Sequence, residues 1–108
     1  MVKIIWTQRS ITDLKSIAEY ISKDSVKYAS LTLERIIDVT KHLETNPRIG
    51  RMVPEIGGND KIREVILGNY RIIYKITSTL TVHILTVHIL TVHHSAKRLR
   101  QTFLRGQK

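Results

Sequence analysis

Hydrophobic residues recur with two different periods in the first part of the chain. In VKIIWT, residues 2–7, they return at every second position, which predicts a β-strand. Over residues 10–23 they return every three or four positions, which predicts an amphipathic helix. Ser10 is the expected N-cap of this helix, because its hydroxyl can accept a hydrogen bond from a backbone N–H of the first turn.

A second helix is predicted after a short link. It begins near Asp24 or Ser25 and ends at TNPRIG, which contains the helix-terminating residues Pro47 and Gly50. Because the link is short, the two helices are expected to form an antiparallel hairpin. The stripe expected to be buried on the second helix consists of Val26, Ala29, Leu33, Ile36, Ile37, Thr40 and Leu43.

The pattern changes to strands and turns in the rest of the chain. RMVPEIGGND, residues 51–60, is rich in Gly, Pro and Asn and is predicted to be a loop. The apolar runs KIREVIL and YRIIYKI flank Gly68-Asn69, a pair typical of a hairpin turn. Residues 77–79 make a further polar turn before the last strand.

The element order is therefore β-α-α-β-β-β. It predicts an α+β fold in which an antiparallel sheet of about four strands packs on an N-terminal helical hairpin. The length fits a single domain, residues 1–108, with a basic tail at about residues 95–108. Alternation along YRIIYKI leaves Arg71 and Lys75 on the open face of the sheet. The side chains of this strand expected to face the helices are Tyr70, Ile72, Tyr74 and Ile76.

The last predicted strand contains a repeat. The unit LTVHI occurs three times over residues 80–94, with His94 replacing Ile in the third copy. Strands usually have about 3–10 residues, so one copy is surplus. Because side chains alternate along a strand, a five-residue spacing would turn His83 and His88 to opposite faces, and no metal site is expected. The strand must bulge, shift its register or run past its domain, where residues 80–94 could pair with a second copy of the chain.

The charge of the chain is unevenly distributed. Residues 10–46 have five Lys/Arg and six Asp/Glu, whereas residues 47–108 have eleven Lys/Arg and three Asp/Glu, and the whole chain carries +9. This basic part suits a polyanion or an acidic partner protein. The chain has no cysteine, no apolar run of about 18 residues and no recognisable secretory signal, so a cytoplasmic protein without a membrane span is expected.

Four pieces of the sequence, in this order, resemble the RelE/ParE superfamily of type II toxin–antitoxin toxins. They are the helix pair starting DLKSIAEYISKDS, the loop NPRIGRMVPE, the run IREVILGNYRIIYKI and the ending VHHSAKRL. The resemblance covers nearly the whole chain. It implies a small toxin, without a cofactor, that a cognate antitoxin neutralises. We expect that antitoxin to be acidic and partly disordered, and to fold on the basic sheet face.

The resemblance to RelE-like nucleases also implies catalytic roles. Cleavage of RNA by its own 2′-hydroxyl needs a base, an acid and cations on the phosphate. Glu55 would be the base, Arg71 would hold the phosphate, and His93 or its neighbour His94 would protonate the leaving oxygen. The further residues expected to contact phosphate or the antitoxin are Arg51, Arg63, Lys75, Lys97 and Arg98.

The target of the toxin stays open at this point. The matching Glu55, Arg71 and His93 favour ribosome-dependent mRNA cleavage. The long helical hairpin resembles instead the ParE-like members, which poison DNA gyrase without known catalytic residues. The surplus repeat favours an inactive homologue that only binds its antitoxin. In the latter two cases Glu55 is a solvated loop residue and Arg71 at most an antitoxin contact.

Overall fold

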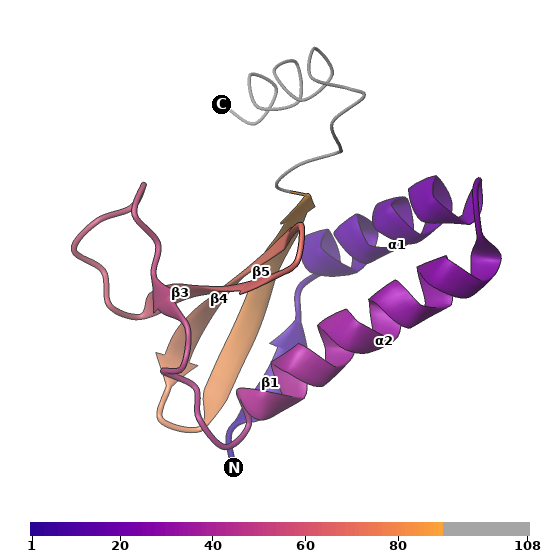
Figure 1. Ribbon diagram of the computed structural model, residues 1–108. Coiled ribbons are helices and arrows are strands. Elements are labelled where there is room, and N and C mark those ends of the chain that lie inside the picture. The colour runs from indigo at the N-terminus through magenta and orange to yellow at the C-terminus, as the bar shows by residue number, and fades with distance from the viewer. Residues whose placement is uncertain (90–108) are drawn as a thin grey trace.

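A computed structural model of the chain describes residues 1–89, which form a sheet with two helices on one of its faces (Figure 1). This arrangement confirms the predicted α+β fold with a helical hairpin. None of the helices within residues 1–89 is long and apolar enough to cross a membrane. The elements are β1 (Lys3–Trp6), α1 (Gln8–Ser22), α2 (Val26–His42), β2 (Arg51–Met52), β3 (Ile62–Leu67), β4 (Tyr70–Ser78) and β5 (Thr81–Ile89).

The sheet has the strand order β1-β5-β4-β3-β2. Strands β2 to β5 are antiparallel to their neighbours, as predicted, but β1 is parallel to β5, so the sheet is mixed. The prediction of a wholly antiparallel sheet is wrong at β1, because a periodic pattern identifies a strand but not the direction of a distant partner. The predicted loop at residues 51–60 also begins with a short strand, β2.

The helices begin at side-chain caps. Thr7, not Ser10, is the N-cap of α1, since its Oγ1 accepts a hydrogen bond from the Ser10 backbone N–H at 3.1 Å. Ser10 is buried and its hydroxyl donates to the Thr7 carbonyl, so the prediction for Ser10 is wrong. Thr7 has the extended backbone that a cap requires and follows β1 directly. For α2, the predicted start near Asp24 or Ser25 is confirmed, and Ser25 is its N-cap, whose Oγ accepts from the Tyr28 N–H at 3.0 Å.

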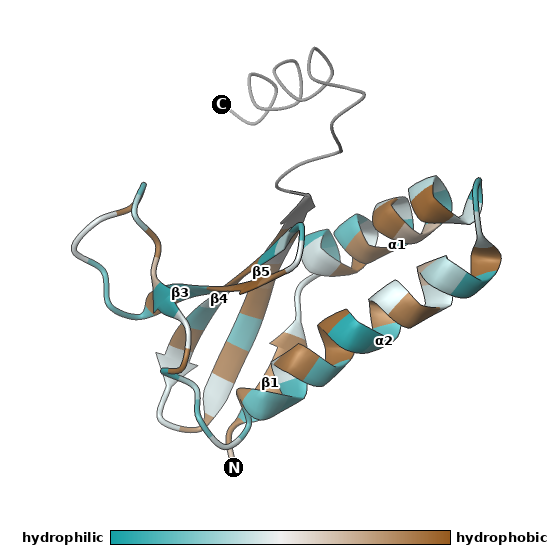
Figure 2. Cartoon of the chain, viewed as in Figure 1, coloured by the Kyte–Doolittle hydropathy of each residue, from teal (hydrophilic) through white to brown (hydrophobic). Residues whose placement is uncertain are grey.

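One hydrophobic core lies between the helices and the sheet, and brown hydrophobic bands recur along both helices in Figure 2. The predicted core side chains of β4 are confirmed, with Tyr70 partly buried. The buried residues of this core are Ile17, Ile36, Leu43, Ile72, Tyr74, Ile76, Val82, Ile84 and Val87.

The predicted stripe on α2 is wrong at two positions. Val26 is 71% exposed, because the first turn of α2 lies at the end of the hairpin away from the sheet (Figure 1). Ile37 is 39% exposed, because successive residues of a helix point about 100° apart and Ile36 occupies the direction toward the sheet. The remaining members, Ala29, Leu33, Ile36, Thr40 and Leu43, are buried or half-buried.

Strand β5 accommodates the five-residue repeat with a β-bulge, one of the three predicted outcomes. Ile73 of β4 pairs with Thr86, whereas the next residue of β4, Tyr74, pairs with Ile84. Leu85 is therefore an extra residue without a partner on β4. A bulge of one residue shifts the alternation by one position, which compensates for the odd length of the repeat.

The burial pattern of β5 shows this compensation. Val82, Ile84 and Val87 are all buried in the core, although the last two are three positions apart. Each of the two described units, residues 80–84 and 85–89, thus supplies four residues to the ladder and one leucine outside it. The prediction that positions 83 and 88 lie on opposite faces of the strand is wrong. Their backbones pair with Lys75 and Arg71, which are four residues apart on β4 and therefore belong to the same face of the sheet.

Helix α1 covers the side of β5 that β1 leaves unpaired. β1 extends only along Thr81–Ile84. Beyond it, the Thr7 hydroxyl donates to the carbonyls of Ile84 and Leu85 at 2.7 and 3.0 Å, and the Val87 N–H donates to Asp13 Oδ2 at 2.9 Å. The described part of the repeat is therefore an interior strand. Pairing with a second copy stays a prediction for residues 90–94, which lie outside the described residues.

We expect the hydrogen bond from the Val87 N–H to the Asp13 carboxylate to stabilise the fold. Asp13→Ala leaves the Val87 N–H without its charged acceptor and should lower the free energy of unfolding by about 1.5–3 kcal/mol. Asp13→Asn, which retains an acceptor oxygen, should lose less. Urea denaturation measures both. Arg9→Ala is the control, because it removes only the exposed Arg9–Asp13 pair; a loss as large as that of Asp13→Ala would contradict the assignment.

Candidate functional site

The segment that leads from α2 to β2 is fixed to the sheet by Tyr74. Its hydroxyl donates to the Pro47 carbonyl at 2.6 Å and accepts from the Gly50 N–H at 3.0 Å. Burial raises the pKa of Tyr74, so the hydroxyl keeps its proton. A Cβ at Gly50 would lie 2.6 Å from the Glu64 carbonyl oxygen, so the chain can approach β3 this closely only with glycine. The close approach places Arg51 beside Glu64.

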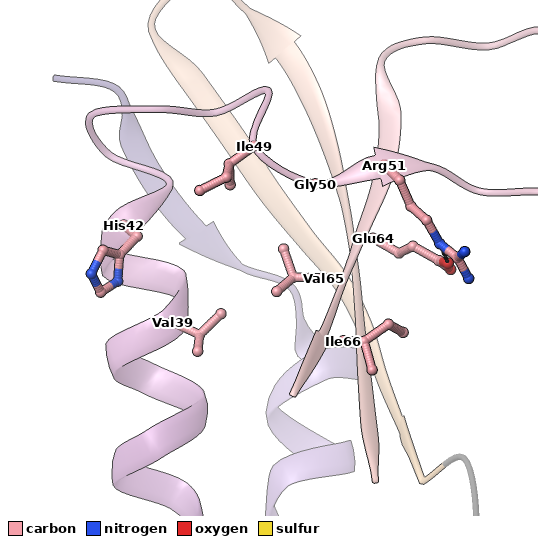
Figure 3. A pocket seen from close by; sticks show the side chains of 8 residues that line it. All are labelled: Val39, His42, Ile49, Gly50, Arg51, Glu64, Val65 and Ile66. Carbon is pink, nitrogen blue, oxygen red and sulfur yellow. Dashed lines mark hydrogen bonds and ion pairs between the residues drawn. The ribbon is translucent and has the colours of Figure 1, made fainter. Parts of the chain in front are cut away.

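Four charged side chains of alternating sign then meet, in the order Arg51, Glu64, Arg71 and Glu55. Glu64 Oε2 lies 2.5 Å from Arg51 Nε, and Glu64 Oε1 lies 2.6 Å from Arg71 Nε. The two Nη atoms of Arg71 donate to the two Glu55 carboxylate oxygens at 2.6 and 2.8 Å. Figure 3 shows Arg51 and Glu64 meeting on the side of β3 that faces away from α2. We call these four residues the charge network.

The inner and outer members of the charge network differ in burial. The side chains of Glu64 and Arg71 are 1% and 15% exposed, whereas those of Arg51 and Glu55 are 67% and 62% exposed. Among the described residues, Glu64 Oε1 and Arg71 Nε have no aligned hydrogen bond, so their contact is an ion pair. A buried carboxylate without a cation is strongly unfavourable. The burial of Glu64 therefore depends on its two cations, the largely buried Arg71 and the more exposed Arg51.

The charge network also sets the protonation of Glu55. Hydrogen bonds from Arg71 lower the pKa of Glu55 below its usual value of 4.5, and the same bonds raise the pKa of Arg71. A carboxylate with a lowered pKa is a weaker base, and general-base catalysis is most efficient when the pKa lies near the working pH. The guanidinium of Arg71 has both of its Nη atoms and its Nε directed at carboxylates. The charge network thus holds the loop and the sheet together.

Two other predicted site residues lie apart from the charge network. Arg63 donates to the backbone carbonyls of Asp60 and Gly50, each at 2.8 Å, and so it braces the loop. It is adjacent to Glu64 on β3 and hence points to the other face of the sheet. Lys75 is exposed on the open face, four residues from Arg71 and so about 13 Å away along β4.

The remaining predicted residues lie outside the described residues. These are His93, His94, Lys97 and Arg98, and their roles stay predictions. Within the described part of the chain, the backbone position opposite Arg71 on β5 is His88. No group of three potential metal ligands comes together in residues 1–89.

The sequence-based prediction did not include Glu64, although it lies at the centre of the charge network. A signal for it exists in the hairpin register. The turn at Gly68-Asn69 pairs Leu67 with Tyr70, which places Glu64 diagonally across from Arg71 on the same face. An acidic and a basic residue at such positions predict an ion pair.

A pocket of about 340 Å³ lies on the other side of β3, between this strand and α2 (Figure 3). Its walls include Val39 of α2, Ile49, and Val65 of β3, so it is mainly apolar. It suits a hydrophobic side chain of another protein better than a reactive substrate. The residues that line it are Val39, His42, Ile49, Gly50, Arg51, Glu64, Val65 and Ile66.

Comparison with known proteins gives the family of the chain. The sequence model of the family described as ParE toxin of type II toxin-antitoxin system, parDE, matches residues 4–99. The chain belongs to the ParE toxin family. This confirms the resemblance to the RelE/ParE superfamily and implies a cognate antitoxin as partner of this ParE family member. No curated protein matches the sequence.

A solved structure is similar to this ParE family member over most of its length. It is described as a chromosomal ParDE TA system from P. aeruginosa, and the match has a TM-score of 0.68 with 18% sequence identity. The match covers 83% of this chain and 97% of that chain. At this level of identity the similarity shows a shared fold.

We expect Arg71 to be essential for stability. Arg71→Met leaves the buried Glu64 carboxylate with only the largely exposed Arg51 as its cation and should lower the free energy of unfolding by about 3 kcal/mol. Arg48→Met is the matched control, because its ion pair with Asp60 is more than half exposed on both sides and should contribute less than about 1 kcal/mol. Equal losses in urea denaturation would show that Glu64 does not depend on Arg71.

We expect the Glu55–Arg71 contact to respond to pH. Since the pKa of Glu55 is lower in the folded than in the unfolded chain, the contact stabilises the fold above about pH 4.5 and is lost as the pH falls through the folded value. The advantage of the native chain over Glu55→Gln should be at most about 1 kcal/mol at pH 7, because Glu55 is largely exposed. Urea denaturation at pH 7 and pH 3 measures it, and a difference independent of pH would contradict the shift.

Proposed function

We propose that this ParE family toxin inhibits growth by binding DNA gyrase, and that it does so through protein contacts without catalytic residues of its own. The observation that carries this proposal is that Glu55 and Arg71 are bound to each other, with the pKa of Glu55 lowered and Arg71 also paired with the buried Glu64. Membership of the ParE family supports it, since ParE-like members are the gyrase-directed branch of the superfamily. The matched region spans the helical hairpin and all of the described sheet except Lys3.

The state of Glu55 argues against a nuclease. A base for the 2′-hydroxyl would have to take a proton on a carboxylate that Arg71 already binds at both oxygens, which weakens that contact, and its lowered pKa reduces its strength. Arg71 would have to exchange Glu55 for a phosphate while still neutralising Glu64. Both changes disrupt contacts that stabilise the fold, whereas binding through the surface requires neither.

The exposed hydrophobic residues beside β3 support a protein target. Ile49 and Ile66 are 58% and 44% exposed and line the apolar pocket, and Met52 of β2 is also exposed. Contacts between proteins bury such side chains at their centre, with charged groups around them. Arg51 supplies a charged group at this place.

Cleavage of mRNA on the ribosome remains the second candidate. One observation favours it: the predicted base Glu55 and the predicted phosphate-binding Arg71 do lie together. In that case His93 or His94 would complete the site as the acid. A third candidate is a homologue that binds its antitoxin without inhibiting growth.

Induction of the chain in growing cells distinguishes these candidates. We expect DNA breaks with intact mRNA, scored in the same culture by break mapping and by mapping of mRNA 5′ ends. With purified gyrase and supercoiled plasmid, the toxin should likewise increase DNA cleavage. Glu55→Gln should retain these effects, whereas a nuclease that lost its base would slow by about 100-fold or more.

The controls make the outcome specific. Glu19→Gln changes an exposed carboxylate on α1 far from the charge network and should behave as the native chain. New mRNA ends within translated codons that disappear with Glu55→Gln but persist with Glu19→Gln would establish the nuclease instead. Neither breaks nor new ends, with antitoxin binding intact, would identify an inactive homologue.

A further inference from the structure

The contacts of β5 recur along its sequence. Thr81–Ile84, the part that pairs with β1, has the same four residue types as Thr86–Ile89. The contacts that α1 makes beyond β1 go to the backbone of β5: Thr7 to carbonyl oxygens and Asp13 to an N–H. The next unit of the repeat therefore offers β1 and α1 the same backbone groups to pair with.

We propose that β5 has a second register, displaced by one LTVHI unit. In it, Thr86–Ile89 pairs with β1 and with the part of β4 that now holds Thr81–Ile84. Residues 91–94 take the places of residues 86–89, and Leu90 becomes the bulge residue. The buried positions keep their residue types, because Val87, Ile89 and Val92 replace Val82, Ile84 and Val87.

Two differences make the displaced register the minor one. The connection between β4 and β5 grows from two residues, Thr79 and Leu80, to seven, which lowers the population about sevenfold through loop entropy. His94 also takes the position of Ile89 beside Tyr70. Displacement in the opposite direction is excluded, because the residues before Leu80 do not follow the repeat.

The displaced register moves the segment that comes after the strand. The first residue after β5 becomes Ser95 instead of Leu90, so the basic residues Lys97 and Arg98 come five positions closer to the end of the sheet. Five residues of a strand span about 16 Å. The position opposite Arg71 stays a histidine, His88 in one register and His93 in the other. The repeat thus acts as a device that sets how far the basic segment extends, whichever target the toxin has.

Disulfide trapping tests the displaced register, and the chain offers a cysteine-free background. Lys75→Cys with His83→Cys joins a pair of the described register. Lys75→Cys with His88→Cys joins a pair only in the displaced register, because position 88 otherwise lies four ladder residues from Lys75, about 13 Å, beyond the reach of a disulfide. In dilute purified protein under mild oxidation, we expect the second pair to form about one tenth as fast as the first.

A deletion of residues 90–94 supplies the matched control. It leaves every described residue of β5 in place but removes the unit that the displaced register needs. The intramolecular Lys75→Cys/His88→Cys bond, identified by mass spectrometry, should then be lost. Equal rates of formation with and without residues 90–94 would show that strand fraying forms the bond, and no bond in the full chain would show a single register; either result overturns the proposal.

Discussion

The bulge at Leu85 is the constraint on which the sheet depends. β5 is an interior strand, and it must bury Val82, Ile84 and Val87 against the helices while it pairs with β1 and β4. In a regular strand, Val87 would face the opposite side from Ile84. The extra residue Leu85 removes this conflict between the two described units. Because β5 holds β1 on one side and β4 on the other, the position of the helical hairpin follows from the same bulge.

The buried carboxylate of Glu64 organises the other side of the sheet in a similar way. It lies at 1% exposure between Arg51 and Arg71, and through Arg71 it determines where the Glu55 loop rests. This arrangement explains how the loop Glu and the strand Arg of a nuclease site can be adjacent and yet serve the fold. The chemical role of a carboxylate depends on its partners, and here each partner is already committed to another charge.

The features predicted from the sequence are those that neighbouring residues decide. The start of α2 near Ser25 and the turn at Gly68, which has a positive φ, depend on a few adjacent positions. The parallel direction of β1 could not be predicted, because it arises from a partner far away in the sequence. The family resemblance alone placed Glu55 and Arg71 in one predicted site; it did not predict that they bind each other. The chemical role of the two residues could not be predicted in the same way, since it depends on Glu64. The neighbours of Glu64 are set by the pairing of β2 with β3.

Because the repeat includes a bulge residue, the number of its units can change without exchanging the faces of β5. Adding or removing a unit of five residues would disrupt an ordinary strand, because all later side chains would exchange faces. Here a whole unit can be added while the core keeps the same residue types, since each described unit brings four ladder residues and one leucine outside the ladder. The core then places little restraint on the number of units.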